Sequence, residues 1–184
     1  MTADRSAVGR KSCRKGKRRE RIFARALSNF WTSGRDPNAF RRTPMSGAFG
    51  GRGSDGDILP MTPEAEQLNF VIEIKDRKET DSFEFADILT NEKCSILKWW
   101  KTLNETILDH PQKHAGKKRL LVVHKRGKDY CVIGIPELTF LEDRAGRFPY
   151  MKIWTPFTET LVVFPLDSLF DLDPESLKSS LLGT

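Results

Sequence analysis

The sequence predicts an α/β fold in which a mixed central β-sheet is flanked by helices. Two observations predict this class: apolar residues recur at helical spacing in 17–31 and 91–108, and short apolar segments follow each of these helices. Helices and strands in this order bury their apolar faces best as layers around one sheet. The chain has 184 residues, of which 38% are hydrophobic, so it can bury a substantial core.

The strands are predicted from short runs of β-branched and aromatic residues between turn residues. After the first helix we expect a short strand at 39–43, a second that begins at 57–59 and a third at 70–76. The last two are expected to pair as an antiparallel hairpin. The remaining predicted elements are strands within 117–126, 129–136 and 161–165, and a short C-terminal helix with Asp173 as its N-cap.

The strand at 70–76 carries two charged residues in an otherwise apolar sequence. Side chains alternate between the faces of a strand, so Ile72 and Ile74 share one face, while Val71, Glu73 and Lys75 share the other. Burying an ionised side chain is costly unless it is paired. Taken alone, the pattern also suits the solvent-facing side of an antiparallel sheet, on which Glu73 and Lys75 would form a weak surface pair.

The charge is unevenly distributed along the chain. Residues 1–56 contain 14 Lys and Arg against 4 Asp and Glu, whereas residues 57–184 contain 17 against 21. A cationic segment binds nucleic acid by releasing counterions from phosphates, and it also occurs as a localisation signal or a membrane-surface tether. Residues 1–16 are small, polar and basic, so we expect a flexible N-terminal arm that is mobile without DNA.

Cysteine usage and hydropathy bear on the compartment. Cys13, Cys94 and Cys131 are far apart and have no zinc-type spacing, which fits a reducing compartment. The sequence has no apolar run of membrane-spanning length and no apolar segment typical of a secretory signal. We therefore expect a cytoplasmic protein without a membrane partner.

The candidate catalytic set consists of three carboxylates and one amine. Glu20 lies at the edge of the core-facing stripe of its helix. Asp57 begins a strand, whereas Asp55 is better suited to the preceding turn. Asp57 and Glu73 on neighbouring strands can hold Mg²⁺, and Lys75 on the face of Glu73 can stabilise charge that develops at phosphorus. The pattern indicates metal-assisted hydrolysis of a phosphodiester.

Three short blocks occur in a defined order: KGKRRER at 15–21, RTPMSG at 42–47 and EIKDRK at 73–78. They resemble the KGxxxER helix start, the RxPxSG loop and the ExKxRK strand of the archaeal-type Holliday junction resolvases, which are PD-(D/E)xK nucleases. A lone ExK pattern arises often by chance, but three blocks in order are much more specific. Gly56 stands where that family has Pro before the Asp, and Lys93 and Cys94 stand where it often has Gln.

The resemblance implies a restriction-endonuclease-like nuclease core at 17–136 and a C-terminal extension at 137–184 that packs on the same domain. The implied enzyme is a homodimer that resolves four-way DNA junctions by paired symmetric nicks and depends on Mg²⁺, for which Mn²⁺ can substitute. Two alternatives stay open. One is a restriction- or repair-like nuclease on duplex or single-stranded DNA, and the other is a non-catalytic DNA-binding protein on the same scaffold.

The resemblance also implies a role for each residue of the candidate site. Asp57 and Glu73 would ligate the metal, with the carbonyl of Ile74 as a third ligand. Glu20 would bind the metal directly or through water. Lys75 would organise the nucleophile.

Further residues are expected to contact DNA. Ser46 would lie close to the scissile phosphate. Arginines in a long loop can also simply keep it soluble, and a basic run can be merely solvated. The expected DNA contacts are Lys11, Arg14, Lys15, Lys17, Arg18, Arg19, Arg41, Arg42, Arg52, Arg77 and Lys78.

Overall fold

The computed structural model describes residues 5–44, 56–76, 84–156 and 158–178, and in the first of these ranges it describes side chains from residue 16 onward. None of the helices in these ranges is both long and apolar enough to cross a membrane. The helices are α1 (Arg5–Trp31), α2 (Pro63–Glu66), α3 (Asp87–Thr90), α4 (Ser95–Leu108), α5 (Pro111–His114), α6 (Ile135–Ala145), α7 (Leu166–Phe170) and α8 (Pro174–Lys178). The strands are β1 (Phe40–Arg42), β2 (Ile58–Pro60), β3 (Phe70–Lys75), β4 (Lys118–Lys125), β5 (Lys128–Gly134), β6 (Met151–Ile153) and β7 (Leu161–Pro165).

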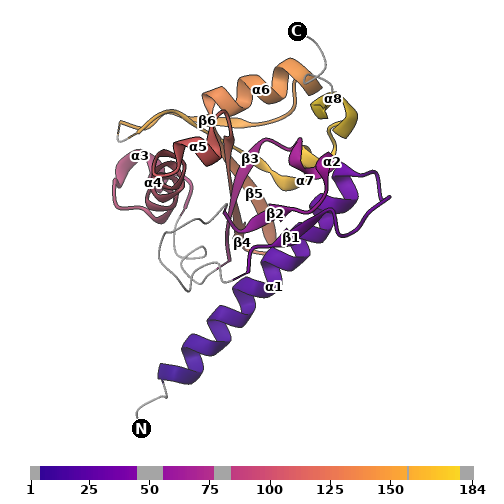
Figure 1. Ribbon diagram of the computed structural model, residues 1–184. Helices are drawn as coiled ribbons and strands as arrows, with labels where there is room; N and C mark the ends of the chain where they lie inside the picture. Colours follow the sequence, from indigo (N-terminus) through magenta and orange to yellow (C-terminus); the bar gives the residue numbers. More distant parts are fainter. Residues whose placement is uncertain (1–4, 45–55, 77–83, 157, 179–184) are drawn as a thin grey trace.

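Five of these strands form the central sheet, in the order β3-β4-β5-β7-β6 (Figure 1). β3 and β4 are parallel, and the other neighbouring strands are antiparallel, so the sheet is mixed. β4 and β5 are joined by the two-residue turn Arg126 and Gly127, both with positive φ, which suits a tight hairpin. The predicted class, a mixed sheet flanked by helices, is confirmed.

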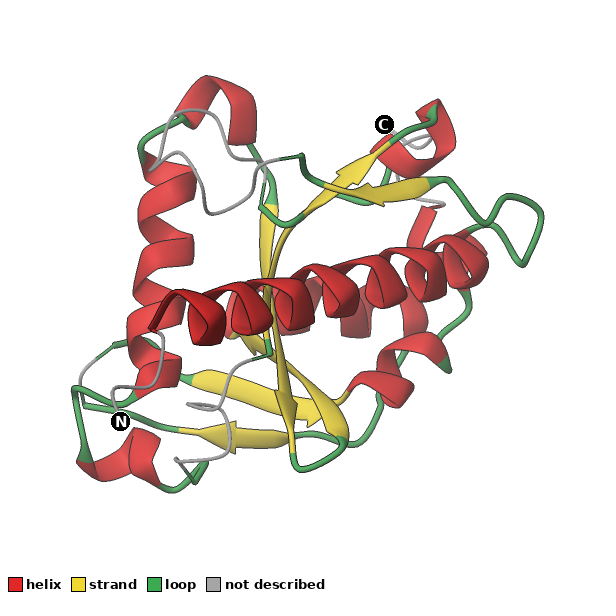
Figure 2. Cartoon of the chain, turned by 90° about the horizontal axis from the view of Figure 1, so that it is seen from below, coloured by secondary structure: helices red, strands yellow, loops and turns green. Residues whose placement is uncertain are grey.

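Helices cover both faces of the sheet. One apolar core combines Leu27 and Trp31 of α1 with Ile72 and Ile74 of β3, and Figure 2 shows α1 crossing the strands. The core on the other face contains Val71 and residues of α4. The predicted alternation of apolar side chains along β3 is therefore confirmed, and both faces of this strand are buried.

Two local predictions differ from the structure. The first helix begins at Arg5 instead of residue 17, because residues 5–16 contain no proline and include several good helix formers. The antiparallel hairpin expected between 57–59 and 70–76 is wrong. β2 pairs with β1, and the chain meets β3 through a parallel bridge between Gly56 and Ile72.

The segment between β2 and β3 explains the parallel bridge. Thr62 caps α2 by accepting a hydrogen bond from the Ala65 backbone, and Pro63 occupies the first helical turn. This small helix takes the place of a tight turn, so the chain returns and enters β3 in the direction of residues 56–58. The apolar pattern alone does not reveal strand direction, because it reports only which faces are buried.

Strands from the C-terminal part of the chain complete the sheet. β7 lies between β5 and β6, and Val163 of β7 pairs with both Val132 and Met151. The sheet therefore draws strands from both sides of residue 136. β6 and α6 were not predicted, whereas the helix after Asp173 is confirmed, since the Asp173 carboxylate accepts a hydrogen bond from the Ser176 backbone at 3.0 Å.

The packing of α1 on the sheet leads to a stability prediction. Leu27 is fully buried, whereas Ile22 on the same helix is 48% exposed. We expect Leu27→Ala to lower the free energy of unfolding by about 2–5 kcal/mol, because it leaves a cavity under the helix. Ile22→Ala should change it by no more than about 0.5 kcal/mol. Urea unfolding of both variants measures this, and equal losses would show that α1 does not pack as described.

Candidate active site

The site is built around the close approach of residues 56 and 57 to strand β3. The Asp57 N–H donates to the Ile72 carbonyl at 2.7 Å, and the Thr43 N–H donates to the Asp57 carbonyl at 2.9 Å. Gly56 has a φ of 83°, and a Cβ atom there would lie only 2.4 Å from the Ile72 carbonyl oxygen. Glycine is therefore required for the backbone to come this close to β3.

The Asp57 side chain is held at the free edge of β3. Its Oδ2 accepts a hydrogen bond of 2.8 Å from the Ile74 N–H. The N–H and C=O groups of one strand residue point to the same edge, so the Ile74 carbonyl faces the side on which Asp57 lies. Asp57 is only 8% exposed, which places a carboxylate in a largely dry environment.

The electrostatic environment of Asp57 brings the predicted carboxylates together. Burial and the nearby negative charge of Glu73 raise the pKa of Asp57 to about 7. Glu20 adds to this rise, while the hydrogen bond from Ile74 and the charge of Lys75 lower the pKa. Four residues predicted from the sequence, one on α1, one beside β2 and two on β3, thus act on one another across the edge of the sheet.

Two of the three carboxylates have a cationic partner. Lys75 forms an ion pair with Glu73, and Arg42 forms one with Glu20, with all four side chains mostly shielded from water. The structure describes no ion-pair partner for Asp57. Because helices cover both faces of the sheet, the Glu73 and Lys75 pair is not the solvent-facing pair of a one-sided sheet.

The donor chemistry of this centre fits a hard divalent cation. Carboxylate and carbonyl oxygens are the ligands of Mg²⁺, and a cation would offset the mutual repulsion that raises the pKa of Asp57. Among the described residues, no three Asp, Glu, His or Cys side chains are already arranged as a closed metal site. Glu20 and Glu73 would have to turn from Arg42 and Lys75 toward the ion.

Of the other residues predicted to contact DNA or lie near the phosphate, only some lie in the described part of the chain. Arg19 turns inward, where its guanidinium contacts His124 and donates to Asp129 at 2.8 Å, and not outward toward DNA as the sequence predicted. Lys17 and Arg18 lie on α1. Ser46, Arg52, Arg77 and Lys78 lie outside the described residues, as do the side chains of Lys11, Arg14 and Lys15.

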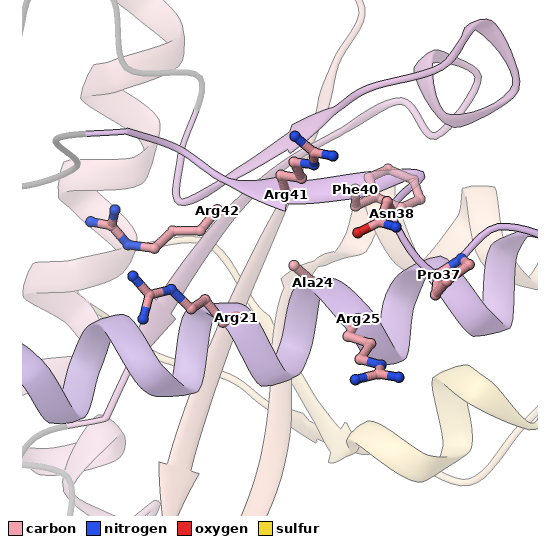
Figure 3. A pocket seen from close by; sticks show the side chains of 8 residues that line it. All are labelled: Arg21, Ala24, Arg25, Pro37, Asn38, Phe40, Arg41 and Arg42. Atoms are coloured by element: carbon pink, nitrogen blue, oxygen red, sulfur yellow. The ribbon is translucent and has the colours of Figure 1, made fainter.

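Two arginines were missed by the sequence prediction. Arg21 and Arg25 of α1, together with Arg41 and Arg42 of β1, line a groove of about 520 Å³ (Figure 3). Lys17, Arg21 and Arg25 follow one another at intervals of four residues, which places them along one face of a helix. This spacing is the signal that identifies them.

The fold and this centre define a nuclease of the PD-(D/E)xK class. Residues 11–175 match a family described as "Phage putative PDDEXK endonuclease". No curated protein and no solved structure matches the chain significantly. The chain belongs to this endonuclease family, which confirms the predicted superfamily. The match does not extend to the archaeal-type resolvases.

The close approach of Gly56 leads to a test with a matched control. Gly127 has nearly the same φ as Gly56, but a Cβ there would have no atom within 4 Å. Gly127→Ala therefore reports the backbone strain alone, about 1–3 kcal/mol. Gly56→Ala should lower the free energy of unfolding clearly more than Gly127→Ala does, because the new Cβ atom forces residue 56 away from β3. Denaturant unfolding of both variants compares them, and equal costs would contradict the contact.

The raised pKa of Asp57 predicts a pH dependence of the metal-free protein. Between about pH 4 and 7 the folded chain retains a proton on Asp57 that the unfolded chain has released. The free energy of unfolding should therefore fall as the pH rises through this window, by an amount on the order of a few kcal/mol from this group. Asp57→Asn should remove that part of the slope. Urea unfolding in EDTA at several pH values measures both proteins, and identical slopes would contradict the burial of Asp57.

Proposed function

We propose that the protein is a DNA endonuclease that depends on a divalent cation and whose centre comprises Asp57, Glu73 and Lys75, with Glu20 as an additional carboxylate. The observation that carries this proposal is the buried Asp57 carboxylate, whose pKa is raised by burial and by Glu73 while Lys75 lies beside them. Membership of an endonuclease family supports DNA as the substrate.

Each residue of the centre has a distinct task in this proposal. Asp57 and Glu73 would hold the cation, with the carbonyl of Ile74 beside them, and the cation would lower the pKa of the attacking water and polarise the phosphate. The Ile74 N–H fixes the orientation of the Asp57 carboxylate. Lys75 would orient the water or donate to a phosphate oxygen as negative charge develops there.

We further infer that the substrate is branched DNA, and in particular a four-way junction. Support comes from the three ordered sequence blocks at 15–21, 42–47 and 73–78. Paired symmetric nicks would require a two-fold homodimer that presents one centre to each of two opposing strands. Residues 17–25 of α1 and strand β1 would then face the DNA next to each centre.

A second candidate keeps the chemistry and changes the substrate to unbranched DNA. Two observations favour it. The matching family is described only as an endonuclease, and the arginine-lined groove offers contacts suited to a phosphate backbone of any shape. Arginine contacts to phosphates position DNA without reading its sequence.

A cleavage assay separates the two candidates. Purified protein with Mg²⁺ or Mn²⁺ should nick a synthetic four-way junction at symmetric positions, at least about tenfold faster than it cuts the linear duplexes of the same arms. Equal rates would establish the second candidate. No cleavage of any DNA with either ion would overturn the nuclease proposal.

Two carboxylate variants test the residue assignment. Asp57→Ala and Glu73→Ala should each lower the rate by about 100-fold or more, because each removes charge that the reaction requires. Junction binding in EDTA should be largely retained, as it should in the control Lys101→Ala on the exposed surface of α4. Loss of binding together with cleavage would point to a structural role for these carboxylates.

A further inference from the structure

A basic groove lies between helix α1 and strand β1, beside the catalytic centre. Ala24 and Phe40, which are both buried, lie at its base, and four arginines surround them. Arg21 and Arg25 come from α1, and Figure 3 shows Arg21 and Arg42 pointing toward the same end of the groove. None of the described residues that line the groove is acidic.

The charges of the groove are unbalanced within the described part of the chain. Arg42 is paired with Glu20, but the structure describes no hydrogen bond or ion pair for the guanidinium groups of Arg21, Arg25 and Arg41. Like charges held close together repel each other, so this arrangement is favoured by a bound polyanion. Arginine suits phosphate in particular, because its planar fork donates two parallel hydrogen bonds.

Among the described residues, Arg42 connects the groove to the catalytic centre. Arg42 lines the groove and also forms the ion pair with Glu20, which acts electrostatically on Asp57. A polymer held in the groove would therefore extend toward Glu20 and Asp57. A small anion would not need this continuity, which favours a chain of phosphates as the occupant.

We propose that the groove binds the sugar–phosphate backbone of the DNA segment next to the scissile phosphate, with Arg21, Arg25 and Arg41 as the phosphate contacts. This inference rests on the proposed function, in that it takes DNA as the substrate. It adds two contacts from α1, Arg21 and Arg25, and assigns them to positioning instead of chemistry. Their loss weakens DNA binding and raises KM, while kcat stays close to that of the wild type.

The test compares two double variants with the same change in charge. Arg21→Gln with Arg25→Gln alters the groove, and Lys98→Gln with Lys101→Gln alters the exposed surface of α4 on the other side of the sheet. Fluorescence anisotropy with a labelled duplex and a labelled four-way junction, in EDTA and between about 50 and 200 mM salt, gives Kd and its salt dependence. Far-UV circular dichroism and urea unfolding establish that each variant is folded.

The groove variant should bind both DNAs at least about tenfold more weakly than the wild type, with a salt slope smaller by about two. The α4 variant should change Kd by less than about threefold. Equal effects in the two variants would overturn the groove assignment, because they would reflect net charge alone. A third variant, Arg41→Gln, should weaken binding in the same direction, and no effect there would remove Arg41 from the contact set.

The outcomes separate this inference from the proposed function. If the wild type cuts DNA and the groove variant binds and cuts as the wild type does, the groove assignment is wrong and the nuclease proposal stands. If the wild type binds DNA through the groove but does not cut it with Mg²⁺ or Mn²⁺, the nuclease proposal is wrong, and of the groove assignment only DNA binding stands. A wild type that does not bind DNA overturns both.

Discussion

The hydrogen bond from the Ile74 N–H to the Asp57 carboxylate is the contact on which the site depends. Among the described strands, β3 lies at the edge of the central sheet, so one row of its backbone groups has no partner in a described strand of that sheet. The Asp57 N–H donates to the Ile72 carbonyl, and the Asp57 carboxylate accepts a hydrogen bond from the Ile74 N–H. One residue thus satisfies buried backbone groups of the sheet and is itself oriented by them. The absence of a side chain at Gly56 makes this approach possible.

The charge balance of the centre is typical of a functional site. Arg42 and Lys75 offset the charges of Glu20 and Glu73, which leaves the third carboxylate, Asp57, in a buried and negative environment. A carboxyl group under these conditions holds a proton up to about pH 7. Stability alone would favour a residue without this cost, and strongly perturbed groups of this kind are concentrated at functional sites. A cation bound at the oxygens of Asp57 would remove the cost.

The sequence predicted the parts of the site that depend on local spacing. Period-two alternation placed Glu73 and Lys75 on one face of β3, the helical apolar stripe singled out Glu20, and the start of a strand singled out Asp57. Strand direction and side-chain partners could not be predicted from the sequence, because both depend on contacts between distant segments. The hairpin failed for the first reason, and Arg19, which contacts Asp129 from 110 residues away, illustrates the second.

Helix α1 contributes to the proposed centre, to the proposed DNA groove and to the core. Successive residues of a helix are turned by about 100°, so neighbouring positions serve different surfaces. Glu20 pairs with Arg42 and acts electrostatically on Asp57, Arg21 lines the groove, and Leu27 packs against the sheet. Since all three belong to one helix, the distance between a phosphate that Arg21 would contact and the Glu20 carboxylate would be set by the helix and not by a loop. In the proposed complex, DNA that contacts α1 would thereby lie close to Glu20.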